Sequence, residues 1–240
     1  MEGRNVQIRN RILALLTIIL LIFVFSGCQN SGQTLPGSSE ISVSPSPSPE
    51  SHMGAYLSVL QNKSKFYSSD TKEELDITQL NQAVSSDSSV TAEVKKFAVV
   101  DLDKDNVPEV ILSLAVNNDD YFGFEVLRYQ DGVVNGYTLW YRSFMELKED
   151  GTFSFSGGAS DYGFGTIKFT EDGYTIDKIT YCESGADTSN NETISYYVNG
   201  ESATQEEFQS AISKQDEKPG VTWYDFTDDS IKTLFSGSAS

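Results

Sequence analysis

The sequence predicts an α+β fold, in which a large antiparallel β-sheet built from hairpins has helices at the N- and C-terminal ends of the domain. Three observations predict it. Apolar residues recur at helical spacing near both ends of residues 52–240. From Ala92 onward, short apolar runs alternate with turn residues. Four Asp-Gly or Asn-Gly pairs separate these runs, and such pairs are strong hairpin signals because both residues of the favoured turn need positive φ.

The N-terminal part of the domain predicts two helices. The first covers Ala55–Phe66, and a weaker one covers Lys72–Val84. In each, apolar residues fall on one side at helical spacing. They are Tyr56, Val59, Leu60 and Phe66 in the first helix, and Leu75, Leu80 and Val84 in the second.

The strands follow the two helices. Phe97–Val100 and Val110–Val116 are near-continuous apolar runs, which is typical of strands buried on both faces. Shorter runs predict the remaining strands: 124–129, 137–141, 144–147, 152–155, 165–169, 174–181 and 194–198. The turn pairs lie at 131–132, 150–151, 172–173 and 199–200.

The C-terminal part returns to helices. Thr204 and Glu207 form a capping box for a helix that runs to Lys214. A last strand is expected at Trp223–Phe226, and Thr227 then caps a short helix that carries Ile231, Leu234 and Phe235.

The N-terminus reads as an export signal. Three arginines precede an apolar run of 14 residues from Ile12 to Phe25, which is shorter than the roughly 20 residues that a spanning helix needs. Ser26-Gly27-Cys28 follows, and the segment resembles a bacterial lipoprotein signal. That resemblance implies cleavage before Cys28, a lipid on its thiol, and a domain on the outer face of the cytoplasmic membrane. An uncleaved N-terminal anchor is the alternative.

The expected organisation is therefore a signal peptide at 1–27, a lipidated Cys and Ser/Pro-rich linker at 28–51, and one globular domain at 52–240. Four of the six prolines lie in the linker, where a Ser-Pro repeat favours an extended backbone. If Cys28 carries lipid, Cys182 has no disulfide partner. We interpret Cys182 as a small buried hydrophobic residue rather than a reactive thiol.

The net charge of the chain limits the classes of molecule that it is expected to bind. The formal net charge is −18, so binding to nucleic acid, which depends on clustered Lys and Arg, is not expected. Cations are the natural partners, although acidic residues also serve solubility alone.

One loop has the spacing of a calcium site. Asp101, Asp103, Asp105 and Glu109 place carboxylates at positions 1, 3, 5 and 9, with the Val107 carbonyl at position 7. Calcium takes six to eight such hard oxygens. An EF-hand also needs a carboxylate at position 12 and flanking helices, whereas position 12 is Leu112 and strands are expected on both sides. The alternative is an acidic turn without an ion.

The strand–Asp-x-Asp-x-Asp–strand pattern over Phe97–Val116 resembles the calcium loops of FG-GAP and VCBS-type β-repeats, though it occurs once. With the lipoprotein signal, the linker and the 150–161 segment, the chain also resembles uncharacterised surface lipoproteins of clostridia-type Gram-positive bacteria. The resemblance implies a shared fold and brings no known activity.

Other functional signals are weaker. Tyr162 and Phe164, next to a Gly-rich loop, are candidate aromatics for a saccharide or peptide, or else pack at a sheet edge. The only histidine is His52, which removes Ser-His-Asp, Cys-His and ordinary zinc-hydrolase sites. We therefore expect no enzyme. We expect instead a lipid-anchored binding protein of the cell envelope with a structural calcium, which contacts a protein or cell-wall partner. A saccharide-binding module is the first alternative, and a glycan hydrolase with two carboxylates is the weakest.

Overall fold

The computed structural model describes residues 50–170 and 173–236. Its helices are α1 (Glu50–Leu60), η1 (Ile77–Gln79), α2 (Leu80–Val84), η2 (Tyr141–Ser143), α3 (Gln205–Asp216) and α4 (Asp228–Ser236), where η marks a 3-10 helix. Its strands are β1 (Phe66–Ser68), β2 (Glu74–Leu75), β3 (Ala92–Val100), β4 (Glu109–Val116), β5 (Asp119–Gln130), β6 (Val133–Trp140), β7 (Phe153–Gly158), β8 (Asp161–Thr170), β9 (Gly173–Ala186), β10 (Glu192–Val198), β11 (Glu201–Ala203) and β12 (Tyr224–Asp225).

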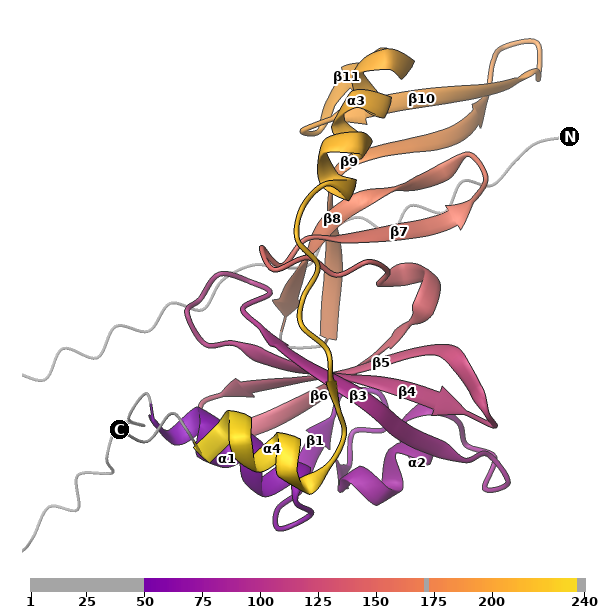
Figure 1. Ribbon diagram of the computed structural model, residues 1–240. Coiled ribbons are helices and arrows are strands. Elements are labelled where there is room, and N and C mark those ends of the chain that lie inside the picture. Colours follow the sequence, from indigo (N-terminus) through magenta and orange to yellow (C-terminus); the bar gives the residue numbers. More distant parts are fainter. Residues whose placement is uncertain (1–49, 171–172, 237–240) are drawn as a thin grey trace, which may run out of the picture. The chain divides into compact units, whose positions relative to one another are not determined.

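These strands form two sheets (Figure 1). The first has the order β12-β3-β4-β5-β6-β1-β2, and the second has the order β11-β10-β9-β8-β7. Both are antiparallel except where β1 pairs in parallel with β6. The predicted α+β class, with a large antiparallel sheet and helices at both ends, is confirmed. The strands divide between two sheets because β6 is followed by the irregular 141–152 segment instead of another hairpin.

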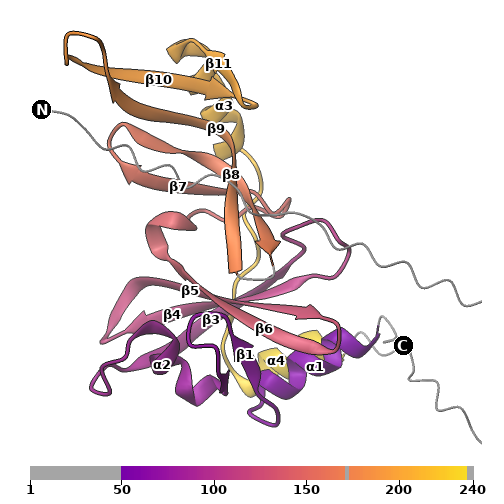
Figure 2. The ribbon, with the colours of Figure 1, turned by 180° about the vertical axis from the view of Figure 1, so that it is seen from behind.

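The first sheet is buried on both faces. One face packs with α1, α2 and α4 around residues such as Tyr56, Phe97 and Phe235. Figures 1 and 2 show α1 and α4 side by side against this face. The other face contributes Ile111 and Val126 to a second cluster, which also contains Phe153 of the second sheet. As expected for a strand covered on both sides, every residue of β4 is buried except Ser113, which is half-buried.

The first helix differs from its prediction at both ends. It begins at Glu50, two residues before the expected domain boundary, and it ends at Leu60 instead of Phe66. Asn62 adopts the left-handed conformation, with φ of 55°, which stops the helix. Phe66 then opens β1 and is almost fully buried in the first sheet. Its place in the helical pattern was therefore a coincidence of spacing.

The second predicted helix is mostly wrong. Of residues 72–84, only Leu80–Val84 form an α-helix, while Glu74–Leu75 form β2. Asp76 ends the strand, because its carboxylate caps the following 3-10 helix by accepting a hydrogen bond from the Thr78 N–H. Leu75 is buried all the same, because it pairs opposite Phe66.

The strand predicted at 144–147 is also absent. There, Met145 makes only an isolated bridge to Ser154. Glu146 has a φ of 50°, which breaks the extended backbone. Phe144 and Leu147 are nevertheless buried in the cluster between the sheets, which explains their apolar pattern.

The predicted Asp-Gly and Asn-Gly turns agree better with the structure. Asp131-Gly132 and Asn199-Gly200 have positive φ at both residues and close the β5–β6 and β10–β11 hairpins. Asp150-Gly151 forms a turn in which the Gly151 N–H donates to the Lys148 carbonyl, without flanking strands. For the fourth pair, Asp172 lies outside the described residues, although β8 and β9 pair across it.

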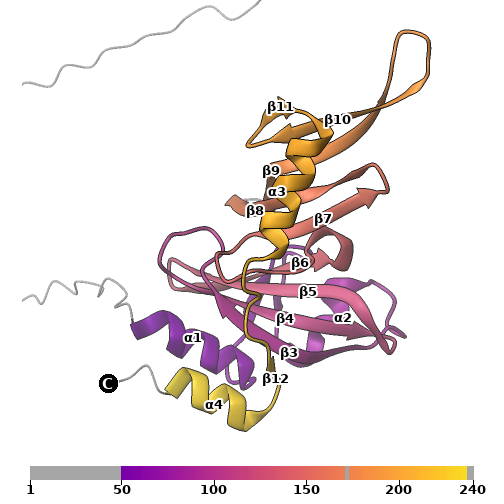
Figure 3. The ribbon, with the colours of Figure 1, turned by 45° about the horizontal axis from the view of Figure 1, so that its top comes forward.

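The C-terminal elements are as predicted. Thr204 accepts a hydrogen bond from the Glu207 N–H while Glu207 accepts one from the Thr204 N–H, so the capping box is confirmed. Figure 3 shows α3 lying along the second sheet. The chain then returns to the first sheet, where β12 pairs with β3 and α4 packs against α1. In the described part of the chain, no helix is long and apolar enough to cross a membrane.

Candidate metal centre

The acidic loop connects two paired strands. The β3–β4 pairing ends at Val100 opposite Glu109, so the two ends of the loop lie next to each other. Between them, Leu102 is fully buried in the cluster between the sheets and anchors the loop. Asn106 adopts the left-handed conformation, with φ of 68°, as position 6 of a calcium loop requires. Strands on both sides confirm that the loop is not an EF-hand.

Backbone N–H groups hold the carboxylates of the loop. Asp101 accepts hydrogen bonds from the N–H groups of Lys104 and Asn106, at 2.8 and 3.1 Å. Glu109 reaches across the loop and accepts one from the Leu102 N–H at 2.8 Å through Oε2. These hydrogen bonds orient the side chains of Asp101 and Glu109 without the help of an ion.

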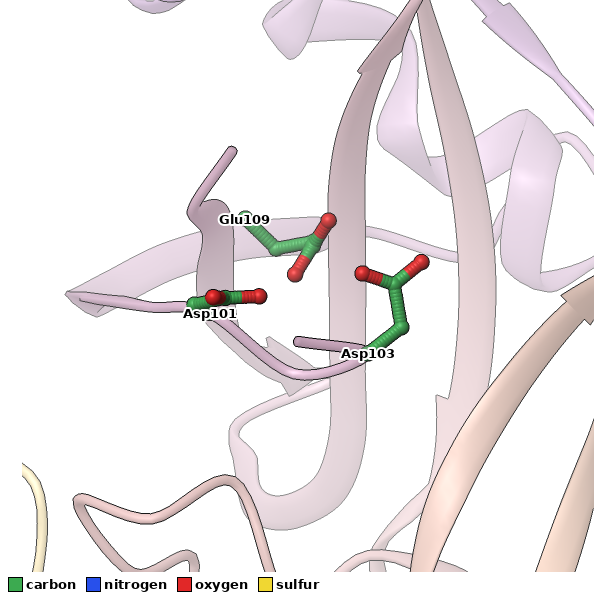
Figure 4. A group of neighbouring side chains, drawn as sticks. All are labelled: Asp101, Asp103 and Glu109. Atoms are coloured by element: carbon green, nitrogen blue, oxygen red, sulfur yellow. The ribbon is translucent and has the colours of Figure 1, made fainter. Parts of the chain in front are cut away.

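Asp101, Asp103 and Glu109 converge, and Figure 4 shows their carboxylates directed toward one another. One ligand atom from each lies within 4.8 Å of the others, so the three residues can hold a metal ion. Two oxygens of this group, Asp103 Oδ1 and Glu109 Oε1, are buried and have no hydrogen-bond partner. Because a buried polar atom without a hydrogen-bond partner costs about 1–3 kcal/mol, the arrangement suits a bound cation.

A guanidinium lies beside the triad. Arg128 of β5 contacts Asp103 Oδ2 at 2.9 Å and Asp105 Oδ2 at 3.2 Å. Its Nε is 3.8 Å from Glu109 Oε1, which is beyond hydrogen-bond distance. The arginine therefore offsets one of the four negative charges and forms a long ion pair with Glu109 Oε1, but neither buried oxygen gains a hydrogen bond from it.

The electrostatics of the site favour a further positive charge. Burial raises the pKa of Glu109 to about 8, and the negative charges of Asp103 and Asp105 act in the same direction. The Leu102 N–H and Arg128 only partly oppose this shift. The site therefore either holds a proton on Glu109 or gains a cation that keeps the carboxylate ionised.

The structure places Asp105 at the rim of the site and does not test the predictions for the Val107 carbonyl and Cys28. Asp105 is 38% exposed in its side chain and bonds to the Val107 N–H and to Arg128. It is not part of the triad. The Val107 carbonyl stays a predicted ligand, and Cys28 lies outside the described residues.

Arg128 was missed in the sequence. It lies 25 residues from Asp103, in a strand that also carries Asp119, Asp120 and Glu125 but no other cation. The register of the sheet brings it to the loop, because Leu127 pairs opposite Val110 and Arg128 is therefore next to Glu109. The single cation of this strand was the available signal.

The predicted ligand aromatics lie on β8, near α3. The Tyr162 ring packs on Phe208 of α3 at 5.5 Å between centroids. Phe164 is 8% exposed, and the Lys218 ammonium lies 5.7 Å from its ring centroid. Cys182, on the next strand, is buried, and burial raises the pKa of its thiol. This agrees with its interpretation as a small hydrophobic residue.

A second buried carboxylate lies in the first sheet. Glu125 of β5 is fully buried and accepts a hydrogen bond from the Thr138 hydroxyl at 2.8 Å, while its Oε1 has no partner. Burial raises its pKa to about 8, and the nearby Asp70 adds to the shift. Among the described residues, Glu125 belongs to no group of three possible metal ligands, so we assign it no ion.

Comparison with models of known protein families, with curated proteins and with solved structures finds no significant match.

Proposed function

We propose that this chain is a lipid-anchored, extracytoplasmic binding protein whose domain is stabilised by one calcium ion in the 101–109 loop. The observation that carries the calcium proposal is the pair of buried oxygens without a hydrogen-bond partner, Asp103 Oδ1 and Glu109 Oε1, within a convergent acidic triad. The anchoring proposal is supported by the sequence before and at Cys28.

The donor chemistry favours calcium over other common ions. All three side chains offer carboxylate oxygen, whereas zinc in structural sites prefers Cys and His. Calcium–oxygen bonds of about 2.3–2.6 Å can bridge oxygens that lie within 4.8 Å of one another. Magnesium demands a nearly ideal octahedron and is reluctant to lose water. We therefore expect calcium to stabilise the domain more than magnesium does.

The role of the ion is structural in this proposal. The loop joins two central strands, and Leu102 ties it to the core between the sheets. An ion that neutralises the triad removes the repulsion between carboxylates at that junction. We propose binding rather than catalysis, because the chain lacks the histidines on which common hydrolytic sites depend.

Thermal unfolding of the full chain tests the calcium site. We would compare chelator, 10 mM magnesium and 10 mM calcium for the wild type, for Asp103→Asn and for a matched control, Asp177→Asn, which changes an exposed carboxylate on β9. Ion at 100 times its dissociation constant stabilises by about 2.7 kcal/mol, or roughly 5–10 °C for a domain of this size. The rise should be specific to calcium, lost in Asp103→Asn and kept in Asp177→Asn. Equal melting temperatures in calcium and chelator would reject the site.

Fractionation of cells tests the anchor. Wild type and Cys28→Ser would be expressed in a Gram-positive host, and the membrane and soluble fractions compared. We expect the wild type in the membrane fraction, with mass spectrometry showing a lipid on Cys28. Unlipidated Cys28, or a variant that stays uncleaved in the membrane fraction like the wild type, would instead support the uncleaved N-terminal anchor.

A further inference from the structure

A cavity lies where β3, β4 and β5 meet the 141–148 and 220–223 segments. Its volume is about 460 Å³, within the range of about 300–1,000 Å³ that is typical of small-molecule sites. Five aromatic side chains line it: Tyr121, Phe124, Tyr141, Phe144 and Trp223. It involves none of the metal-triad residues, so an inference about it goes beyond the proposed function.

A local irregularity in the sheet builds the aromatic wall. The β4–β5 register shifts between Leu114 and Val116, at the start of β5. A bulge of this kind changes the direction of side chains, so Tyr121 and Phe124 face one cavity although they are three residues apart. Gly123 between them allows the close approach of β6, because a Cβ there would clash with the Leu139 carbonyl. Bulges are common next to binding sites.

The rings form a continuous apolar surface. Phe124 stacks with Tyr141 at 6.3 Å and 19° and with Trp223 at 5.9 Å and 29°. Tyr121 meets Tyr141 edge-on, with 5.3 Å between centroids. The packing fixes Phe124, which is 8% exposed, whereas Tyr121 at the outer end is 70% exposed. A largely exposed tyrosine at the edge of a stacked aromatic cavity favours ligand contact rather than core packing.

The polar groups of the cavity are balanced in charge. Lys96 and Lys148 carry positive charge, and Asp120 and Glu146 carry negative charge. Two of each sign favour a ligand that is polar but uncharged overall. The net charge of −18 on the chain also disfavours polyanions. The cavity therefore favours a neutral ligand with one apolar face and many hydroxyl groups.

A pyranose has this chemistry. One face of the ring presents C–H groups that pack on an aromatic face, and the hydroxyls at its edge hydrogen bond with carboxylate, ammonium and hydroxyl groups. We infer that the cavity formed by Tyr121, Phe124, Tyr141 and Trp223 binds a neutral saccharide. Tyr121 covers one sugar face, while Lys96 and Glu146 bind hydroxyls at the rim.

Titration of the full chain with two neutral trisaccharides, cellotriose and tri-N-acetylchitotriose, tests this inference. Binding would be followed by calorimetry and by tryptophan fluorescence, to which Trp223 in the cavity contributes. At least one sugar should give saturable binding below 10 mM. Tyr121→Ala should weaken it at least tenfold and leave the melting temperature within about 2 °C, because the side chain is exposed.

Trp140→Ala is the matched control. Trp140 lies on the same sheet and is 58% exposed, but it does not line the cavity. Its ring contacts Phe122 instead. Affinity should be unchanged in this variant. The inference is overturned if neither sugar binds at 10 mM, or if Trp140→Ala weakens binding as much as Tyr121→Ala does. If Tyr121→Ala unfolds, Lys96→Gln takes its place, and it should weaken binding without moving the melting temperature.

Discussion

Replacement of Arg128 by methionine tests how the acidic loop is held together. Arg128 is the only cation that contacts the loop carboxylates among the described residues, and its side chain is 13% exposed. Its guanidinium also lies 4.9 Å from the ring centroid of Phe169 in the second sheet. Methionine keeps an apolar side chain against that ring and removes the charge together with the hydrogen bonds of the guanidinium to Asp103, Asp105 and Gln130.

The structure gives the size of the effect. At an effective dielectric constant of about 20, the 2.9 Å contact with Asp103 is worth roughly 6 kcal/mol of attraction, whereas Glu109, with its raised pKa, adds little without an ion. Desolvation of the charges cancels most of this attraction, and loss of one partner of a buried pair costs about 3–5 kcal/mol. We take about 3 kcal/mol, because Asp103 and Asp105 keep some contact with water. The melting temperature should then fall by roughly 6–12 °C.

Thermal unfolding in chelator and in calcium provides the assay. Calcium should recover part of the loss, because the ion replaces the missing positive charge. Arg142→Met is the matched control, since Arg142 is exposed and donates only to the Ser156 hydroxyl. A fall of less than 2 °C in chelator, or one equal to that of the control, would refute the idea that the guanidinium stabilises the loop.

Three further predictions concern stability. Leu102→Ala should cost about 2–5 kcal/mol in urea unfolding, because the side chain is fully buried, and a cost below 1 kcal/mol would mean that Leu102 does not anchor the loop. Thr204→Ala should cost about 1 kcal/mol by removing the cap of α3, and an unchanged urea midpoint would contradict this. The pKa of Glu125 is about 8 when folded, against 4.5 as the ordinary value, so its stabilising effect is complete below about pH 4.5 and is lost as pH rises toward 8. Wild-type stability should fall by up to roughly 4 kcal/mol from this group between pH 5 and pH 8. Glu125→Gln should remove this part of the decline and leave the part due to Glu109, whose pKa is also raised to about 8, and an equally steep decline would show that Glu125 does not contribute.

The features that were predicted correctly depend on local chemistry. Asp131-Gly132 and Asn199-Gly200 specify their hairpins because few other residues adopt positive φ at both turn positions. Thr204 with Glu207 specifies the start of α3, because the two side chains satisfy each other's backbone groups. The 1-3-5-9 spacing likewise marks a loop whose carboxylates converge, although only three of the four belong to the triad.

The features that were missed depend on distant parts of the chain. Phe66 fits a helical pattern, but its burial comes from strand pairing with β2 and β6. Phe144 and Leu147 look like a strand, because the cluster between the sheets requires them to be apolar in any conformation. Arg128 reaches the loop only through the register of β4 with β5. The spacing of apolar residues predicts which residues are buried, but it does not predict which helix or strand covers them.

The return of the chain to the first sheet sets the order in which the domain can be completed. Phe97 packs against Tyr224, Phe226 and Phe235, which come more than 120 residues later. During synthesis in the N-to-C direction, β3 therefore lacks its edge partner β12, and the sheet face that carries Phe97 stays partly uncovered, until residues 224–235 have been made. Contacts so distant in sequence slow folding, so the docking of α4 against α1 is expected to be a late step in folding.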